Sequence, residues 1–366
     1  MFSDVVNAKL TASYRLGSHH RVIFSNTFQH YKRTGRDTVA QKFYGGRDYF
    51  GNPSALQKNI SGIGLEGSYA GGRLKLSTAI KHYYAKVKGY TIDWTTLFPS
   101  DQSLSAVAYN IAFAYKLKEN LLLKTSYEHA ARLPEAEEAF GDLMLIRPNP
   151  SITTEKSDNI NAGLLYNTQK WDVELSGFFR AVDNVIYLRS TQFYSTYENL
   201  LSANVTGVEG AIRFYPTAQL SINANATYQD LRNRSIIDNS TINNERYKNA
   251  RIPNVPYLFI NGGIAYTKEN LLKKNTALQI WWNTAYTHEY FLYWEVDGAR
   301  DLKNRIPTQW LQYAGASYSL KDKGISISLE ANNLLDRKTY DNFKVQLPGR
   351  SYSIKLRFYQ SKKHKI

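Results

Sequence analysis

The sequence predicts an all-β fold, an antiparallel transmembrane β-barrel in which about fifteen segments qualify as strands. Three observations lead to this fold class. Apolar and polar residues alternate along many segments, most of which reach the roughly 9–11 residues of a tilted membrane strand. The connections between these segments are alternately short and long. No stretch approaches the roughly 18 consecutive apolar residues that a membrane-crossing helix needs.

The alternation is clearest in segments 9–16, 73–83, 221–229, 325–332 and 351–359. In a β-strand successive side chains point to opposite faces, so alternate residues share a face. One face of the last segment is apolar and consists of Tyr352, Ile354, Leu356 and Phe358. Its other face is polar or charged and consists of Ser351, Ser353, Lys355 and Arg357. One face therefore suits lipid and the other suits water.

The connections fall into two classes by length. The short ones, most of which contain turn-forming residues, are 17–20, 70–72, 118–120, 167–169, 216–218 and 321–324. The long ones are 34–57, 89–102, 132–153, 189–197, 231–254, 291–306 and 334–349. Strands that run up and down between periplasmic turns and extracellular loops produce this alternation. Because the last strand follows a long connection, Phe358 and Tyr359 are expected to end it at the periplasmic face.

Aromatic residues gather near the ends of the predicted strands, as at Tyr83, Tyr84, Tyr90 and Trp94. In a barrel such residues form girdles at the two membrane interfaces. The alternative is an aromatic core, or a surface for stacking a ligand, in a soluble β protein.

Composition excludes several classes of protein. Without cysteine, the chain can form neither a disulfide nor a thiolate metal site. The net charge is +15, but Lys and Arg are spread along the alternating segments, so nucleic acid is not a predicted partner. We expect one barrel domain, residues 1–359, followed by a basic periplasmic tail, residues 360–366.

No catalytic or metal-binding pattern is present. The histidines have no spacing that places two of them on one face with a carboxylate, so no metal or cofactor is predicted. Glu135, Glu137 and Glu138 resemble paired carboxylates, but in a long polar loop we interpret them as a solvated helical turn. The chain is therefore not predicted to be an enzyme.

Two motifs carry a resemblance to a known family. The first, near the carboxyl end, comprises Asn332, Asn333, Leu334, Asp336, Pro348, Gly349, Arg350 and Phe358. The second, an R-x-P loop at Arg132 and its return, comprises Asn149, Pro150 and Glu155. With both motifs in this order and strand-like segments between them, the sequence resembles the TonB-dependent outer-membrane receptors.

The resemblance implies a localisation and a role. Such receptors carry a plug domain, a short segment that contacts TonB, and a barrel of roughly 22 strands. Here about fifteen strands are present, no plug precedes them, and the segment 1–7 lacks the features of a signal peptide. We expect the carboxyl-terminal part of such a barrel, in the Gram-negative outer membrane and in contact with its lipid. The intact parent would import a scarce nutrient, such as a ferric siderophore, with TonB acting through the plug.

Ligand recognition is expected in the extracellular loops, where aromatic and Arg side chains contribute most to binding. The candidates are Tyr44, Arg47, Tyr49, Trp94, Arg132, Arg147, Tyr194, Tyr197, Trp294 and Arg300. The alternative is that each of them only decorates a loop or a girdle. The excess of Lys and Arg suits an anionic small molecule or chelate.

Two other functions are compatible with alternating strands. One is a passive outer-membrane porin or solute channel, and the other is a secreted, soluble β carbohydrate-binding protein. Neither explains both motifs. If an odd number of strands such as fifteen closed on themselves, the first and last would run in the same direction and pair in parallel.

Overall fold

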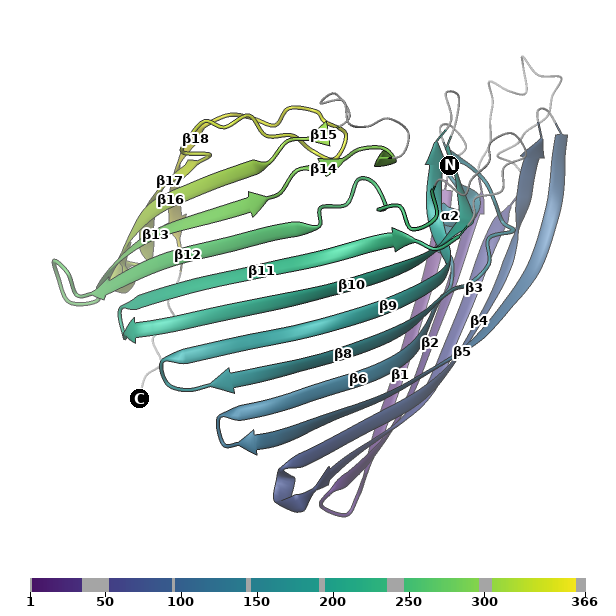
Figure 1. Ribbon diagram of the computed structural model, residues 1–366, viewed down its shortest axis with the longest axis horizontal. Helices are drawn as coiled ribbons and strands as arrows, with labels where there is room; N and C mark the ends of the chain where they lie inside the picture. The colour runs from purple at the N-terminus through teal and green to yellow at the C-terminus, as the bar shows by residue number, and fades with distance from the viewer. Residues whose placement is uncertain are drawn as a thin grey trace.

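The computed structural model describes residues 2–34, 53–93, 96–142, 146–190, 195–235, 247–295 and 305–359. Over these ranges the chain forms one large sheet of sixteen strands. The short strand β7 (Ile146–Arg147) pairs in parallel with β10 at the side of the sheet. The other fifteen are antiparallel and follow each other in the order of the chain (Figure 1). The predicted fold class and the predicted number of strands are confirmed.

The bounds of the elements are as follows. The first eight strands of the main path are β1 (Phe2–Leu16), β2 (His20–Thr34), β3 (Ser54–Tyr69), β4 (Leu74–Asp93), β5 (Thr96–Lys118), β6 (Leu121–Arg132), β8 (Glu155–Asn167) and β9 (Trp171–Ser190). The other seven are β10 (Ser195–Thr217), β11 (Leu220–Asn233), β12 (Leu258–Glu269), β13 (Thr276–Thr287), β16 (Gln309–Leu320), β17 (Ile325–Asn332) and β18 (Ser351–Phe358).

The remaining elements are small. Strands β14 (Tyr290–Phe291) and β15 (Arg305–Ile306) form a separate pair. The short helices are η1 (Ala70–Gly72), α2 (Ala136–Phe140) and η5 (Lys321–Lys323). None of the helices in the described ranges is long and apolar enough to cross a membrane.

The short connections lie at one end of the sheet and the longer ones at the other, which we call the turn end and the loop end (Figure 1). The six predicted tight turns are present, and a further short one, 270–275 between β12 and β13, was not predicted. At the turn end, Gly324 has a φ of +60°, and its carbonyl accepts a 2.7 Å hydrogen bond from the amide of Tyr359. Phe358 pairs with Ile325 there, so the last strand ends where it was expected to end.

Two of the predicted long connections are wrong. In 89–102, strand β4 continues to Asp93 and pairs without interruption with β5, which begins at Thr96. In 189–197, β9 continues to Ser190 and pairs with Ser195 of β10. In both segments the backbone pairing continues through residues that the sequence pattern did not mark as strand.

Strands β2–β5 divide into two halves with different side-chain patterns. The turn half comprises residues 20–25, 62–69, 74–81 and 108–118, and its outer face carries exposed apolar side chains. These include Phe24, Ile63, Leu65, Ile80, Tyr109, Ile111 and Phe113. Its other face is polar and, together with the neighbouring strands, lines a hollow, which identifies it as the concave face. The turn half thus has the pattern of a membrane strand.

The loop half, residues 26–34, 54–61, 82–93 and 96–107, has the opposite pattern. Its concave face holds the buried apolar residues Leu56, Ala85, Val87, Leu104 and Ala106. Its outer face is mainly polar and holds Asn26, Gln57, Asn59, Ser61, His82, Lys86, Lys88, Asp101, Ser103 and Ser105, together with Phe28, Tyr84 and Val107. The pairings of β2, β3, β4 and β5 run through both halves without a register shift. Most apolar side chains therefore lie on the outer face in the turn half and on the concave face in the loop half. The backbone pairing is continuous from one half to the other.

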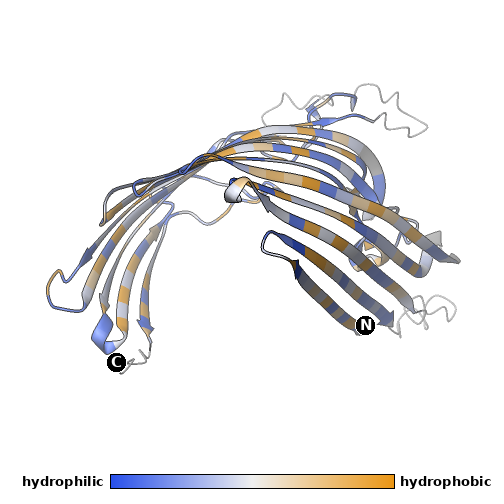
Figure 2. Ribbon diagram, turned by 90° about the horizontal axis from the view of Figure 1, so that it is seen from below, coloured by the Kyte–Doolittle hydropathy of each residue, from blue (hydrophilic) through white to orange (hydrophobic). Residues whose placement is uncertain are grey.

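The sheet is open. Its order begins at β1 and ends at β18, and no pairing joins these two strands among the described residues. Figure 2 shows an arch whose two edges, near the N and C termini, lie apart. Both edge strands run from the loop end to the turn end. Because the arch does not close on itself, the parallel pairing expected for a closed sheet does not form.

Candidate functional site

Residues 133–142 and 146–154, which we call the fold-back, follow β6 at the loop end, and Leu133, Ala139 and Phe140 among them pack against the concave face of β2–β5. Phe140 is fully buried and packs in one cluster with Leu56, Val87 and Leu104. Burying a side chain of this size stabilises a protein by about 1.5–3 kcal/mol. Tyr83, expected in an outer girdle, packs against this cluster on the concave face instead, while Trp94 lies outside the described residues.

Two glycines permit this packing. At Gly89 of β4, an added Cβ would lie 3.0 Å from the Phe140 ring, so the ring occupies the space that a side chain would take. Gly141, just after α2, has a φ of +56°, and an added Cβ would lie 2.1 Å from the carbonyl oxygen of Ile146. The chain can therefore turn back tightly after Phe140 only because residue 141 has no side chain.

Helix α2 begins with a capping box. The Glu135 side chain accepts a hydrogen bond from the backbone of Glu138, and the Glu138 carboxylate accepts one from the Glu135 backbone amide at 2.8 Å. Such reciprocal bonds satisfy two amides that a helix start leaves unpaired. The expected helical turn is thus confirmed. Glu135 and Glu137 are exposed as expected, whereas the Glu138 side chain is only 15% exposed.

Cations hold the fold-back at three points. Arg132 donates to Glu138 at 2.9 and 3.0 Å and to Glu155 at 3.2 Å. Arg33, buried on the concave face, donates to the carbonyl oxygens of Phe140 and Gly141 at 2.8 and 2.7 Å. The ammonium group of Lys58, 7% exposed, lies 2.7 Å from the Glu135 carboxylate.

Amide side chains secure the return of the fold-back. Gln102 of β5 donates to the carbonyl oxygens of Pro150 and, at 2.9 Å, of Ile152. Asn149 donates to the carbonyl oxygen of Tyr197 at 2.8 Å. In this structure the family-motif residues Asn149 and Pro150 therefore bond the fold-back to β10 and β5. Glu155 of β8 contributes through Arg132, which it shares with Glu138 of the fold-back.

The carboxyl-terminal motif has a similar role. The Asn333 side chain is nearly buried, donates to the Arg337 carbonyl oxygen at 2.8 Å and accepts from the Arg337 amide at 2.9 Å. Asp336 accepts from the Arg350 amide at 2.8 Å, and a Cβ on Gly349 would lie 2.7 Å from the same Asp336 oxygen. These contacts set the path by which the chain enters β18.

The predicted ligand residues are only partly within the described ranges. Tyr44, Arg47, Tyr49, Trp94, Tyr194 and Arg300 lie outside them. Arg147 of β7 belongs to the fold-back and is paired with Thr196 next to Tyr197, and Arg132 is bonded to Glu138 of the fold-back. Trp294 lies elsewhere, with its ring 5.3 Å from that of Tyr247.

A second cluster of charged and aromatic residues at the loop end was not predicted. Arg251 lies 2.9 Å from Asp230 and 4.2 Å above the Tyr257 ring. Burial raises the pKa of Tyr257, and the cation of Arg251 opposes this shift. Burial and the Asp341 carboxylate raise the pKa of Tyr290 in β14. These residues come from distant segments, so no local sequence pattern joins them.

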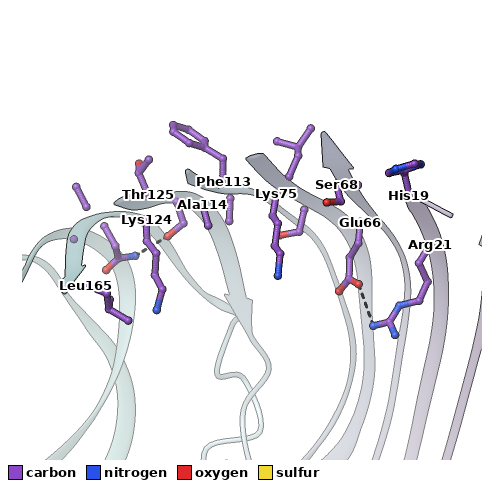
Figure 3. Close-up of a pocket in the computed structure, with 18 of the residues that line it drawn as sticks. His19, Arg21, Glu66, Ser68, Lys75, Phe113, Ala114, Lys124, Thr125 and Leu165 are labelled. Atoms are coloured by element: carbon purple, nitrogen blue, oxygen red, sulfur yellow. Dashed lines mark hydrogen bonds and ion pairs between the residues drawn. The ribbon is translucent and has the colours of Figure 1, made fainter. Parts of the chain in front are cut away.

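The turn half of the concave face lines a hollow of about 1050 Å³. Figure 3 shows Lys75 and Lys124 pointing to one side of the sheet and Phe113 to the other. Arg21 of β2 and Glu66 of the neighbouring strand β3 form an ion pair at 3.0 Å on this face. No group of three or more His, Asp or Glu able to hold a metal ion occurs in the part of the chain that the structure describes. The arrangement supplies a water-facing, charged wall and no catalytic constellation.

Comparison with known proteins identifies a family for the chain. Residues 2–334 match the family described as "TonB dependent receptor-like, beta-barrel". No curated protein matches the sequence at a significant level.

Solved structures share the fold. The FrpB iron transporter from Neisseria meningitidis, F5-1 variant, is 14% identical, and the match covers 97% of this chain and 56% of that one with a TM-score of 0.74. The copper transporter OprC is 15% identical over 97% and 56% of the two chains, with a TM-score of 0.73. BauA, the ferric preacinetobactin receptor from Acinetobacter baumannii, is 14% identical over 97% and 53%, with a TM-score of 0.69. The chain spans about half the length of these structures.

Proposed function

The chain belongs to the TonB-dependent receptor β-barrel family, and from this premise we propose that it forms part of the wall of an importer for a small metal chelate. The barrels of this family are outer-membrane proteins, and the matched family and structures are receptors and transporters, not enzymes. We place the chain in the outer membrane of a Gram-negative cell. Its whole parent would take its energy from TonB through a plug domain.

One observation carries this proposal. Nearly the whole chain superimposes on receptors and transporters whose names specify iron, copper or ferric preacinetobactin. An anionic chelate is the cargo class that best suits a chain with a net charge of +15. A soluble carbohydrate-binding protein does not account for the family match.

The ligand would bind at the loop end of the concave face, next to the fold-back. Arg147 and Tyr197 are the described candidates, because Arg147 lies in the packed fold-back and the Tyr197 backbone is bonded to it, so both have a rigid support. Arg132 would act indirectly, since its guanidinium is already bound to Glu138 and Glu155. Rigid support matters because a preformed site loses less conformational entropy on binding.

Disruption of the gene in its own host tests the proposal. Uptake of ⁵⁵Fe supplied as chelates and of ⁶⁴Cu would be compared in the wild type, the disrupted strain and a strain without TonB. We expect uptake of one metal to fall in the disrupted strain to the level of the strain without TonB. Unchanged uptake of both metals would contradict the proposal. A loss that leaves the TonB-dependent part intact would favour the passive channel.

A further inference from the structure

The turn between β12 and β13, residues 270–275, differs from the other connections that the structure describes at the turn end. It is six residues long, whereas the others have two to four, and it projects at the left of Figure 1. Among these described connections it alone contains large apolar residues, Leu271 and Leu272, which are 44% and 76% exposed. Exposing such side chains to water is unfavourable, so the surroundings of this turn are informative.

Hydrogen bonds define the shape of the turn. The Asn270 amide donates to the Thr276 carbonyl oxygen at 2.7 Å, and the Asn275 amide donates to the Asn270 side chain at 2.8 Å. Asn270 and Asn275 have φ values of +56° and +60°, a region in which asparagine is enriched. The Lys321 amide of the adjoining turn donates to the Asn275 carbonyl oxygen at 2.8 Å. The two leucines are therefore carried by a bonded turn that is tied to its neighbour.

The turn folds over the outer face of the sheet. By register Thr276 belongs to the row of directly paired residues Leu320, Ile325 and Phe358, and Phe358 lies on the exposed apolar face of β18. Thr276 is nevertheless only 2% exposed, and its hydroxyl donates to the Lys273 carbonyl oxygen at 2.8 Å. Residues of the turn thus cover this side chain from the outside, which is the side that faces lipid in a membrane strand.

The same row sets the level of the turn. Leu320, Ile325 and Phe358 are the residues at the turn end of β16, β17 and β18, so the outer face stays apolar up to the point where the strands end. A turn that begins at this level leaves the hydrocarbon and enters the layer of lipid headgroups. Leu271 and Leu272 therefore lie next to lipid and not in bulk water.

The surroundings of the two leucines are positively charged. Glu269 is already engaged, since its carboxylate lies 2.6 Å from the ammonium group of Lys321. Lys273 and Lys274 are exposed and have no ion pair among the described residues. In the turn, in its flanking strand residues and in the adjoining turn η5, the lysines are Lys268, Lys273, Lys274, Lys321 and Lys323, and the acidic residues are Glu269 and Asp322. The cations thus outnumber the acids beside an apolar tip.

We propose that the turn 270–275 is a binding site for anionic phospholipid in the inner leaflet of the outer membrane. Leu271 and Leu272 would enter the boundary between headgroups and acyl chains. Lys273 and Lys274, with Lys323 of the adjoining turn, would contact lipid phosphate. Apolar contact alone does not select among phospholipids, whereas lysines at a membrane surface favour anionic ones. The proposal requires that the strands cross the outer membrane with the turn end toward the periplasm, but it does not depend on the imported cargo.

The test uses the absence of cysteine from the chain, which leaves one introduced cysteine as the sole labelling site. The full chain with L271C, labelled with a small fluorophore, is reconstituted in phosphatidylcholine vesicles. A small fraction of the lipid is either phosphatidylglycerol or phosphatidylcholine with a quenching nitroxide high on one acyl chain. We expect about twofold or more stronger quenching by the phosphatidylglycerol, since each cation at an anionic surface contributes up to about fivefold. Equal quenching by the two lipids, or quenching by aqueous iodide with none by lipid, would overturn the proposal.

Two variants of the labelled chain separate charge from apolar contact. Adding K273Q/K274Q/K323Q is expected to abolish the preference for phosphatidylglycerol. Adding L272Q keeps every charge and is expected to lower quenching by both lipids about twofold or more, because the apolar tip is lost. A preference that persists in the first variant, or quenching that is unchanged in the second, would contradict the proposal.

A matched control places the label at S18C in the turn between β1 and β2, which contains no lysine. There the two quenching lipids are expected to act equally, and the same preference at this position would overturn the proposal. Inorganic phosphate at constant ionic strength is expected to change nothing. Loss of the preference in its presence would show a site for free phosphate and would also overturn the proposal. Because no transport is measured, failure here leaves the metal-uptake experiment unaffected, and failure of that experiment leaves this one unaffected.

Discussion

In the turn half of strands β2–β5 the outer face is mainly apolar and the concave face polar, whereas in the loop half the outer face is mainly polar and the concave face carries the buried apolar cluster. The reversal has a different cause on each face. On the outside, hydrocarbon gives way to the headgroup layer and water, so apolar side chains lose their advantage. On the inside, the fold-back covers Leu56, Val87 and Leu104 and excludes water from them. The same four strands therefore continue from a level where apolar side chains face outward to a level where they are covered on the concave side.

The largest effect is expected at the centre of the covered region. F140A leaves a cavity among Leu56, Val87 and Leu104 and should destabilise the fold-back by about 3–5 kcal/mol. Hydrogen exchange of residues 133–154 measures this as faster exchange. The matched variant F113A, on the lipid side of the turn half, should leave exchange in 133–154 unchanged. Equal effects of the two variants would mean that the fold-back is not held by this packing.

A lysine scan locates the membrane boundary on the outer face, which the change from apolar to mainly polar side chains places between Ile80 and His82 of β4. L76K puts a charge in the apolar rows of the turn half and should cost about 2–4 kcal/mol. H82K lies above the boundary and should change stability by less than about 1 kcal/mol. Urea unfolding from phospholipid vesicles measures both. Similar costs for the two variants would contradict a boundary between the Ile80 and His82 rows.

A smaller effect is expected at the ion pairs of the fold-back. R132M leaves Glu138 and Glu155 without their cation, and because both are partly exposed we expect a loss of about 1–2 kcal/mol. Hydrogen exchange of 133–154 again gives the measurement. R21M, which breaks the more exposed pair with Glu66 in the turn half, serves as the control and should leave that exchange unchanged. An unchanged fold-back in R132M would show that packing alone holds it.

Much of the fold could be predicted from the sequence, and the failures have one physical origin. The pattern of 73–83 is clean because, up to Lys81, its residues alternate between lipid and water. From residue 82 the apolar residues Tyr83, Ala85 and Val87 occupy the concave positions, so the phase of the pattern shifts by one residue. In a sequence this shift looks like the end of a strand, and the prediction accordingly ended this strand at residue 83, whereas β4 continues to Asp93.

The candidate site was less predictable than the fold. Arg132 and the motif residues Asn149 and Pro150 were found because they match a family pattern. Arg33, Lys58 and Gln102 were not found, because their partners are 48 to 108 residues away in the chain or are backbone carbonyls. No local pattern marks such contacts.

The sequence by itself determined the strands, the alternating turns and loops, and the family, since each depends on residues close together or on a fixed motif. Only the tertiary structure decided which face is apolar at each level of β2–β5. That choice depends on what covers each face, and the cover on the concave side is the Phe140 segment, brought there by Gly89, Gly141 and Arg33. A side chain becomes part of a core only when another part of the chain excludes water from it.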